Sequence, residues 1–402
     1  FTLHHQLPTA PTNHNMAVNL ASHIAEKVMG DVPTSTTQDM TRHPTGEKMK
    51  ATVWHGKQDV RVDLVDKPQV IEPTDALIAV RSPPQVSQNS PHCVIYTYIY
   101  TYIFVCIQVT GTTVCGSDLH LYNGEIMQLK EGDILGHEFC GVVESVGSAV
   151  KHIKPGQRVV ASFQIACGQC EYCKKGLSSM CDTTNKSSVQ NAMYGHRFAG
   201  LFGYSHFAGG FSGGQSEYVR VPFAETNLLP IPEGVPDEKA LYLSDIVSTS
   251  YHACKRAHIK RGTDVVGIWG LGPIGLLCAQ WCKLMGARRV IGIDNVEDRL
   301  KFAGERLGIE TINFDDAEKG DTVKQVQDLV PGGLDKTIDC AAFRYAKGLL
   351  HKVERALALE TDTSEIVNEQ IKCVKKVRND ALLSPTFLEI LMCAYGGACA
   401  VV

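Results

Sequence analysis

Four cysteines in one short run carry the clearest chemistry of this chain. They are Cys167, Cys170, Cys173 and Cys181, with the spacing C-x2-C-x2-C-x7-C. Four thiolates this close together suit one tetrahedral metal ion, and zinc is the usual occupant. Because sulfur would fill all four positions, none is left for a substrate, so we expect a structural zinc. Two disulfides or four buried free thiols are the less favoured alternatives.

A second group of metal-binding side chains lies outside this cluster. Cys115 stands in the sequence C-G-S-D and His137 in G-H-E. A catalytic zinc has three protein ligands and one exchangeable position, and a nearby carboxylate orients a histidine ligand. Cys115 and His137 are therefore candidate ligands of an open zinc site. The polar residues that flank them are Ser117, Asp118, His120 and Glu138.

The third ligand of this open site must lie further along the chain. Asp245, in the segment L-S-D-I-V, is the best candidate, and His252 and Cys254 are rivals. An aspartate here is also explained as a carboxylate at the start of a helix. The residues alone leave this choice open.

A glycine-rich loop forms a third chemical feature. The sequence G-L-G-P-I-G places Gly270, Gly272 and Gly275 directly after an apolar run, and Asp294 follows 19 residues after Gly275. This order is typical of dinucleotide binding: N–H groups at a helix N-terminus hold the pyrophosphate, and the carboxylate binds the ribose 2′-OH. A carboxylate at position 294 would repel a 2′-phosphate, so the sequence favours NAD over NADP.

The elements that must position these residues change character near the middle of the chain. Short apolar runs rich in β-branched residues predict a β-rich or barrel-like first half. Alternating strands and helices predict a parallel sheet with helices on both faces in the second half, after a linker near Pro230–Asp245. The predicted strands are Lys50–Trp54, Val60–Val65, Ala76–Val80, Gly141–Val146, Arg158–Ala161, Asp264–Trp269, Arg289–Ile293, Thr311–Phe314 and Lys336–Cys340, and the predicted helices are Ile274–Met285 and Thr322–Leu329.

Composition excludes other classes of function. A net charge of -4 over 402 residues gives no electrostatic basis for binding nucleic acid or an anionic membrane. Fifteen cysteines in a chain with no signal-peptide pattern fit the reduced thiols of a cytoplasmic protein. Residues 1–48 mix His, Thr, Pro and Asn without a long apolar stretch, so we expect a disordered extension there.

Two segments do not fit the pattern. Residues 82–108 contain Pro83-Pro84 and a charge-free run of Ile, Tyr, Thr and Val, and they interrupt the strand that leads to Cys115. We interpret them as an insert that arises from translated non-coding sequence or an error in the gene assignment. The tail, 376–402, follows the fourth recognisable strand, whereas a full dinucleotide-binding sheet has six. We therefore expect an incomplete sheet.

Taken in order, C-G-S-D-x-H, G-H-E, the four cysteines and G-x-G-x-x-G closely resemble the zinc-containing medium-chain alcohol dehydrogenases. The sequences Y-V-R-V-P-F-A-E-T-N-L-L at 218–229 and L-S-D at 243–245 are most similar to the glutathione-independent formaldehyde dehydrogenase branch. The resemblance runs from about Met49 to Lys375. It implies an α/β fold with a GroES-like catalytic domain, 49–245, and a Rossmann-type parallel sheet, 246–375, truncated at its C-terminus.

The resemblance also implies a role for each site residue. In that branch an aspartate completes the catalytic zinc site together with a cysteine and a histidine, and it falls on Asp245. Glu138 is an occasional extra ligand. Ser117 and His120 match the proton-relay positions, and Thr249 matches a residue beside the nicotinamide. The implied cofactors are two Zn²⁺ ions, one catalytic and one structural, and NAD.

The expected function is hydride transfer between an alcohol or hydrated aldehyde and NAD. The alternatives are a polyol or threonine dehydrogenase of the same superfamily, and a truncated protein that binds zinc and nucleotide without catalysis. Members of the family are homo-oligomers, an assembly that we do not expect of a chain with an incomplete sheet.

Overall fold

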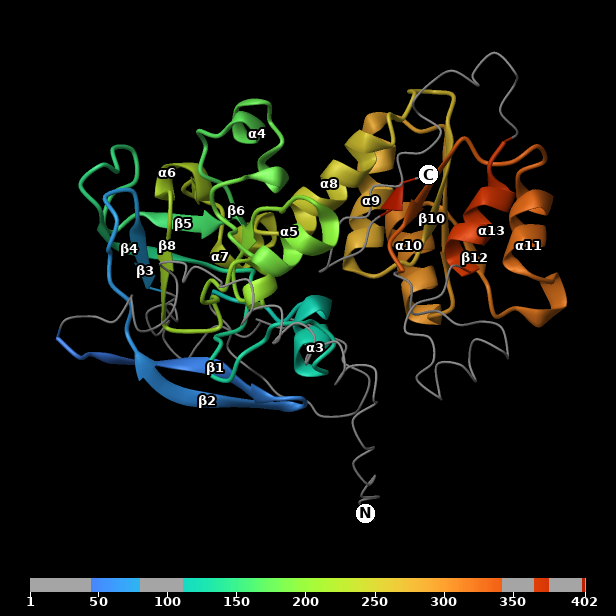
Figure 1. Cartoon of the computed structure of the whole chain (residues 1–402). Helices are drawn as coiled ribbons and strands as arrows, with labels where there is room; N and C mark the ends of the chain where they lie inside the picture. Colours follow the sequence, from blue (N-terminus) through green and yellow to red (C-terminus); the bar gives the residue numbers. More distant parts are fainter. Residues whose placement is uncertain (1–44, 80–110, 342–364, 376–399, 402) are drawn as a thin grey trace, which may run out of the picture. The chain divides into compact units, whose positions relative to one another are not determined.

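The computed structural model describes residues 45–79, 111–341, 365–375 and 400–401 (Figure 1). The chain divides into two compact units, and the boundary in the sequence lies between Asp245 and Ile246. The predicted insert at 82–108 lies outside the described residues, as do almost all of the extension 1–48 and of the tail 376–402.

Short strands dominate the first unit, as predicted. The two longest, β1 and β2, pair as an antiparallel hairpin. In chain order the elements are β1 Lys48–Gly56, β2 Asp59–Asp66, β3 Ala76–Ala79, α3 Gly116–Tyr122, β4 Cys140–Val146, β5 Arg158–Ala161, β6 Gln164–Ile165, α4 Glu171–Lys174, η1 Ser178–Met180, α5 Ser188–Tyr194, β7 Gly200–Leu201, η2 His206–Ala208, β8 Tyr218–Val221, α6 Ala224–Asn227, β9 Leu228–Pro230, α7 Asp237–Ala240 and η3 Leu241–Leu243.

One antiparallel sheet supports the first unit. Five of its described strands lie in the order β8-β3-β4-β5-β9. Ile78 and Val143 of this sheet are buried and belong to one hydrophobic core with Phe139 and Phe202. The rings of the two phenylalanines pack edge to face, with their centroids 5.1 Å apart. Burial of each such side chain stabilises the folded state by about 1.5–3 kcal/mol. The core therefore anchors the backbone at Phe139, two residues beyond His137.

The segment Pro230–Asp245, which the sequence predicts as the linker between the halves, packs on the first unit. Its strand β9 pairs with β5. Ile231, Ala240 and Leu241 are buried against Cys140 of β4 and Val160 of β5. Apolar side chains spaced along this proline-containing segment fasten it to the first unit.

The second unit alternates strands and helices. Its elements are α8 Ile246–Arg256, β10 Val265–Trp269, α9 Pro273–Met285, β11 Arg289–Asp294, α10 Glu297–Leu307, β12 Glu310–Asn313, η4 Ala317–Lys319, α11 Thr322–Leu329, β13 Lys336–Asp339, α13 Glu365–Cys373 and β14 Ala400–Val401. No helix among the described residues is long and apolar enough to cross a membrane.

The sheet of the second unit has the strand order β12-β11-β10-β13-β14 among the described residues. The first four strands are parallel, and the two-residue β14 joins β13 antiparallel. One face packs on α8, α9 and α10 and the other on α11 and α13, as Figure 1 shows. A parallel sheet covered on both faces confirms the predicted fold class.

Candidate metal centres and nucleotide site

The four cysteines of the short run converge on one point. Their sulfur atoms lie within 4.8 Å of one another, and the Sγ distances Cys167–Cys173 and Cys170–Cys181 are both 3.9 Å. A disulfide bond measures about 2.05 Å, so these sulfurs are not bonded. In a tetrahedral zinc site with Zn–S bonds of about 2.3 Å, the sulfurs lie about 3.8 Å apart. The spacing therefore fits one zinc ion.

The electrostatics of this cluster also fit a cation. Burial alone would raise the pKa of Cys167, but hydrogen bonds from Thr183 and from the N–H groups of Gln169 and Cys170 lower it to about 6. Burial and the neighbouring Cys170 thiol raise the pKa of Cys173 to about 12. Thiols that compete in this way do not all ionise together, whereas a bound zinc ion stabilises all four thiolates.

A second cluster brings together Cys115, His137, Glu138 and Asp245, whose ligand atoms lie within 4.8 Å of one another. His137 Nε2 is 3.5 Å from Asp245 Oδ2 and 3.9 Å from Glu138 Oε1. These distances are long for hydrogen bonds, but ligands of one tetrahedral zinc are about 3.3–3.8 Å apart. Among the described residues, this cluster and the four cysteines are the groups that could hold a metal ion.

Helix α3 sets the position of Cys115. Cys115 is the N-cap residue, and its N–H donates to Asp118 Oδ2 at 2.8 Å in a capping box. This arrangement satisfies a backbone donor that the helix start leaves free. It places the Cys115 side chain at the N-terminus of the helix and holds the Asp118 carboxylate beside the cluster.

Aromatic rings and a serine fix the other ligands. The His137 ring meets Phe163 at 6.4 Å and Tyr204 at 6.3 Å, both edge to face. Ser244, the neighbour of Asp245, donates its hydroxyl to the carbonyl of Ala161 at 2.6 Å and lies 3.4 Å from the carbonyl of His137. The end of the first unit is thereby tied to the segment that carries the histidine.

Buried polar atoms in this cluster lack ordinary hydrogen-bond partners among the described residues: both ring nitrogens of His137, Asp118 Oδ1 and Glu138 Oε1. Burial alone would lower the pKa of His137, but Asp245, Cys115 and the charge of Asp118 raise it well above its usual value. Burial raises the pKa of Glu138 and of Asp118. A buried cluster this rich in acidic groups is stabilised by a cation, and its sulfur, nitrogen and oxygen donors suit zinc.

The two predicted relay residues lie on α3. Ser117 is buried, and its hydroxyl is 3.6 Å from Cys115 Sγ. His120 is partly exposed, and its Nδ1 lies 2.9 Å from Glu125 Oε2. Nothing in the sequence pattern indicated Glu125, which pairs with His120 because α3 ends between them.

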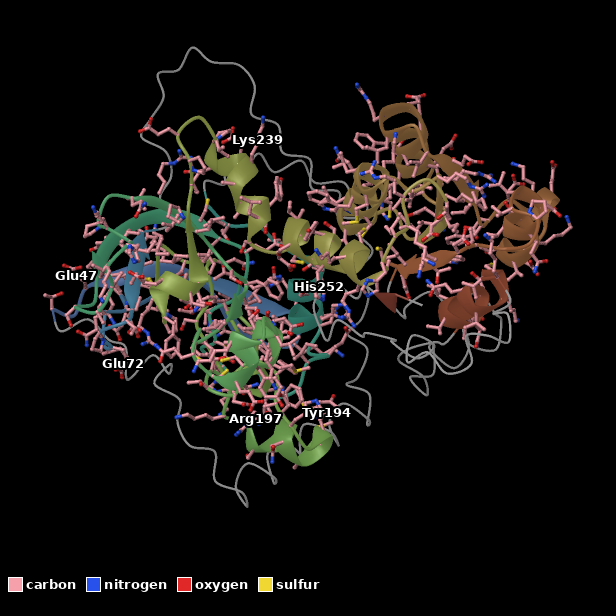
Figure 2. The ribbon with its side chains drawn as sticks, turned by 90° about the horizontal axis from the view of Figure 1, so that it is seen from above. Glu47, Glu72, Tyr194, Arg197, Lys239 and His252 are labelled. Carbon is pink, nitrogen blue, oxygen red and sulfur yellow. The ribbon has the colours of Figure 1, made fainter. Side chains whose placement is uncertain are left out.

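The rivals of Asp245 lie elsewhere. Cys254 is fully buried in the core of the second unit, 3.7 Å from Cys282 Sγ and 3.4 Å from the carbonyl of Cys278. His252 is exposed on α8, where Figure 2 labels it. Thr249, predicted beside the nicotinamide, lies on the same helix in the second unit.

The glycine-rich loop has the backbone that its sequence predicts. Gly270 has φ +88°, and Gly272 is the N-cap residue of α9. A Cβ on Gly275 would lie 1.9 Å from the carbonyl oxygen of Gly270, so only glycine fits there, whereas a Cβ on Gly272 would meet nothing within 4 Å. Gly272 therefore keeps open space in front of the helix N-terminus, as an approaching pyrophosphate requires.

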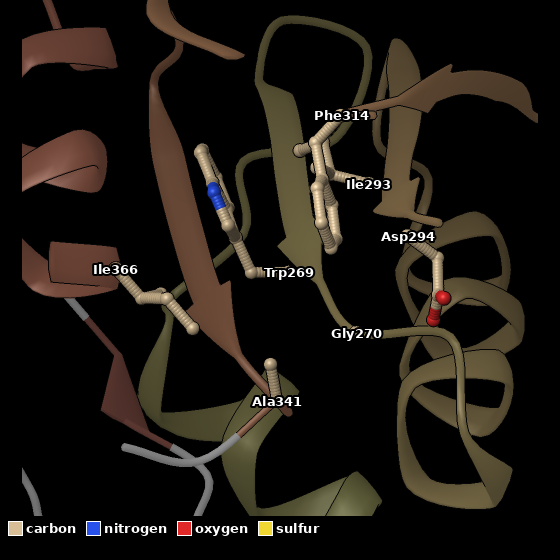
Figure 3. A pocket seen from close by; sticks show the side chains of 7 residues that line it. All are labelled: Trp269, Gly270, Ile293, Asp294, Phe314, Ala341 and Ile366. Carbon is tan, nitrogen blue, oxygen red and sulfur yellow. The ribbon is translucent and has the colours of Figure 1, made fainter. Parts of the chain in front are cut away.

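Asp294 ends β11 beside this loop. Its Oδ2 accepts the N–H of Leu271 at 2.6 Å, and its Oδ1 accepts those of Asn295 and Val296 at 2.7 and 2.9 Å. Figure 3 shows its carboxylate next to Gly270. The residues that line this pocket are Trp269, Gly270, Ile293, Asp294, Phe314, Ala341 and Ile366. Asp294 thus organises the loop as well as facing the pocket.

Comparison with known proteins agrees with this geometry. Residues 104–233 match the alcohol dehydrogenase GroES-like domain family, and residues 273–370 match the zinc-binding dehydrogenase family. A zinc-type alcohol dehydrogenase-like protein of Schizosaccharomyces pombe is 37% identical over 91% of this chain and 79% of its own length. A glutathione-independent formaldehyde dehydrogenase of Bacillus subtilis is 34% identical over 73% of this chain and 66% of its own length, slightly less than two thirds.

Solved structures share the fold. An alcohol dehydrogenase from Thermus sp. ATN1 superposes with a TM-score of 0.62 at 29% identity, over 81% of this chain and 75% of that one. A zinc-binding dehydrogenase from Sinorhizobium meliloti, bound to NADP, has a TM-score of 0.58 at 26% identity, over 82% and 74%. The chain therefore belongs to the zinc-type alcohol dehydrogenase family of medium-chain oxidoreductases.

Proposed function

We propose that this protein is an NAD-dependent zinc dehydrogenase that oxidises a short alcohol or a hydrated aldehyde. The observation that carries the proposal is the convergence of Cys115, His137, Glu138 and Asp245 in the first unit, separate from the four-cysteine cluster. A closed four-sulfur site has no place for substrate, whereas a mixed site with three firm ligands has one. The named formaldehyde dehydrogenase relative supports the substrate class.

Cys115, His137 and Asp245 would hold the catalytic zinc, with Glu138 beside them as an additional carboxylate. A bound zinc ion supplies Lewis acidity that makes a substrate hydroxyl easier to deprotonate. The 3.7 Å approach of Asp118 Oδ1 to His137 Nδ1 leaves Nε2 for the metal and orients the ring. Phe163 and Tyr204 enclose that ring and exclude water from it.

Ser117 and His120 would remove the proton. The buried Ser117 hydroxyl is next to Cys115 Sγ, where it can accept a proton from the substrate hydroxyl. His120, one helical turn away and partly exposed, can pass a proton to solvent with Glu125 as its partner. A bound NAD would supply the acceptor for the hydride, with its electron pair, that the substrate carbon gives up as this proton leaves.

The second unit would supply the hydride acceptor. The open N-terminus of α9 at Gly272 suits the pyrophosphate, and Asp294 suits a ribose with a free 2′-OH. Although the Sinorhizobium relative holds NADP, a carboxylate at this position would repel the 2′-phosphate. We therefore propose NAD as the cofactor.

The direct test is NADH formation by the purified, zinc-loaded protein with a series of short alcohols and with formaldehyde. We expect turnover with NAD that Ser117→Ala lowers about 10²–10⁴-fold, with zinc content unchanged. A protein that binds two zinc ions and NAD but reduces no NAD with any of these substrates would contradict the proposal. That result would favour a non-catalytic zinc- and nucleotide-binding protein.

A further inference from the structure

We propose that Gln215 is a positioning residue for the open metal site. Its side-chain amide holds Asp118, which contacts the ligand His137, and Thr113, which contacts Glu138. The inference rests on the proposed function, because it concerns the same zinc site. Gln215 lies 78 residues beyond His137 in the chain and belongs to none of the motifs that the sequence predicts.

The contacts of the amide nitrogen carry this inference. Gln215 Nε2 donates to Asp118 Oδ2 at 3.1 Å and to the carbonyl of Thr113 at 3.2 Å. An amide nitrogen carries two hydrogens, and both are used here. The side chain therefore bridges the helix start that presents Cys115 and the segment that precedes it.

Through Asp118, the bridge reaches the histidine ligand. Asp118 Oδ2 receives hydrogen bonds from Gln215 and from the N–H of Cys115, which leaves Oδ1 directed at His137 Nδ1, 3.7 Å away. Two donors on one oxygen stop the carboxylate from rotating. Without Gln215, the Asp118 carboxylate has one fixed contact and more freedom to turn away from His137.

Through Thr113, the bridge reaches Glu138. The Thr113 hydroxyl donates to Glu138 Oε2, and the Thr113 N–H donates to the Glu138 carbonyl at 3.3 Å. Gln215 fixes the Thr113 carbonyl and thereby the segment that holds this carboxylate. One side chain thus restrains the partners of both His137 and Glu138.

The position of Gln215 is itself fixed by the fold. Its N–H donates to the carbonyl of Leu135, and its carbonyl accepts the N–H of Thr52 at 2.8 Å. A Cβ on Gly136, the residue before His137, would lie 2.5 Å from Gln215 Cγ. The glutamine side chain therefore packs directly over the backbone that carries the histidine.

The test is a metal-affinity measurement on the full chain. In Gln215→Met the shape is kept and both donors are lost. We expect zinc affinity at the open site to fall about tenfold, the lower end of the effect of outer-shell partners, with the four-cysteine site unchanged. Competition with a chelator measures both sites in one molecule, and cobalt substitution reports the open site separately through its visible spectrum.

Gln190→Met is the matched control. Gln190 is fully buried in α5 of the same unit, and its Nε2 donates to the carbonyl of Phe207 at 3.1 Å, away from the cluster. Gln190→Met also loses the bonds that Gln190 Oε1 accepts from Phe198 N–H and Asn185 Nδ2. None of these partners belongs to the metal cluster, so we expect stability to fall and open-site affinity to stay. Gln215→Glu keeps the size of the side chain but sets a carboxylate against Asp118, and we expect it to bind zinc at least as weakly as Gln215→Met.

The outcomes are distinguishable. If the unaltered protein binds only the four-cysteine zinc, the proposed function fails. If it binds two zinc ions and Gln215→Met retains open-site affinity within twofold, the inference about Gln215 is wrong. Equal losses at both sites, or the same loss in Gln190→Met, would show a general effect on folding and would also overturn it.

Discussion

At the scale of single residues, the open site is a buried group of acidic side chains around one histidine. His137 and Asp245 are almost fully buried, and the ring nitrogens of His137 have no ordinary hydrogen-bond partner among the described residues. Buried polar groups are normally hydrogen-bonded or bound to an ion. Burial would lower the pKa of His137, but the neighbouring anionic groups favour its charged form and raise the pKa above its usual value.

Replacing Asp245 should separate the two metal sites. Asp245→Asn exchanges a carboxylate for a weak neutral ligand, so we expect zinc content to fall from two ions to one per chain. Cys181→Ser should remove the other ion and leave the open site filled. Metal analysis after dialysis against a chelator checks both variants, and two zinc ions retained by Asp245→Asn would exclude Asp245 as a ligand.

Asp294 should matter for stability as well as for the cofactor. In Asp294→Ala the N–H groups of Leu271, Asn295 and Val296 lose their acceptor. We expect the free energy of unfolding to fall by about 3 kcal/mol, the order expected for buried hydrogen bonds to a charged group. Urea denaturation measures this loss.

The control for Asp294 is Arg299→Ala. The Arg299 guanidinium is 3.6 Å from Asp294 and partly exposed, and exposed ion pairs contribute about 1 kcal/mol or less. Equal destabilisation by the two substitutions would contradict the structural role given to the Asp294 carboxylate.

At the scale of elements, the junction of β10 and α9 separates the folding role of one glycine from the binding role of another. Gly275→Ala would drive a Cβ into the Gly270 carbonyl, so we expect a strongly destabilised protein. Gly272→Ala meets no atom within 4 Å, so it should fold normally but bind NAD weakly, because its Cβ occupies the approach of the pyrophosphate. Thermal unfolding and NAD titration together check this division, and normal NAD binding by Gly272→Ala would disprove it.

Strands and helices were predictable where one physical signal dominated. Strands β10, β11 and β13 are buried apolar runs, and their predicted bounds differ from the observed ones by one residue at most. Helix α10 was not predicted, since only Leu300 and Ala303 of its residues are buried and its N-cap, Val296, makes no side-chain cap. Seven-residue α3 was missed because a cysteine caps it.

The candidate site could be predicted only as far as local motifs extend. Cys115 and His137 are recognisable because polar neighbours surround them in the sequence. Asp245 was one of three choices until the family resemblance selected it. Gln215 and Glu125 give no sequence signal, because they reach the site through tertiary contacts.

At the scale of the whole molecule, zinc should stabilise the folded state. A metal that binds only the folded chain adds RT ln(1 + [Zn]/Kd), about 2.7 kcal/mol at 100 times the Kd. Protons compete for the same sulfur and nitrogen atoms, so the gain should shrink steadily as the pH falls from 8 to 5. Melting temperatures with and without zinc, from pH 8 to pH 5, measure this, and a zinc effect that does not depend on pH would contradict thiolate and imidazole ligation.

Diffraction from crystals of the purified protein, recorded on both sides of the zinc absorption edge, tests the central claim most directly. We predict two anomalous peaks per chain, one among the four cysteine sulfurs and one within about 2.0–2.3 Å of Cys115 Sγ, His137 Nε2 and an Asp245 carboxylate oxygen. A single peak among the four cysteines, or a second peak that Asp245 and His137 do not share, would contradict the proposed catalytic centre.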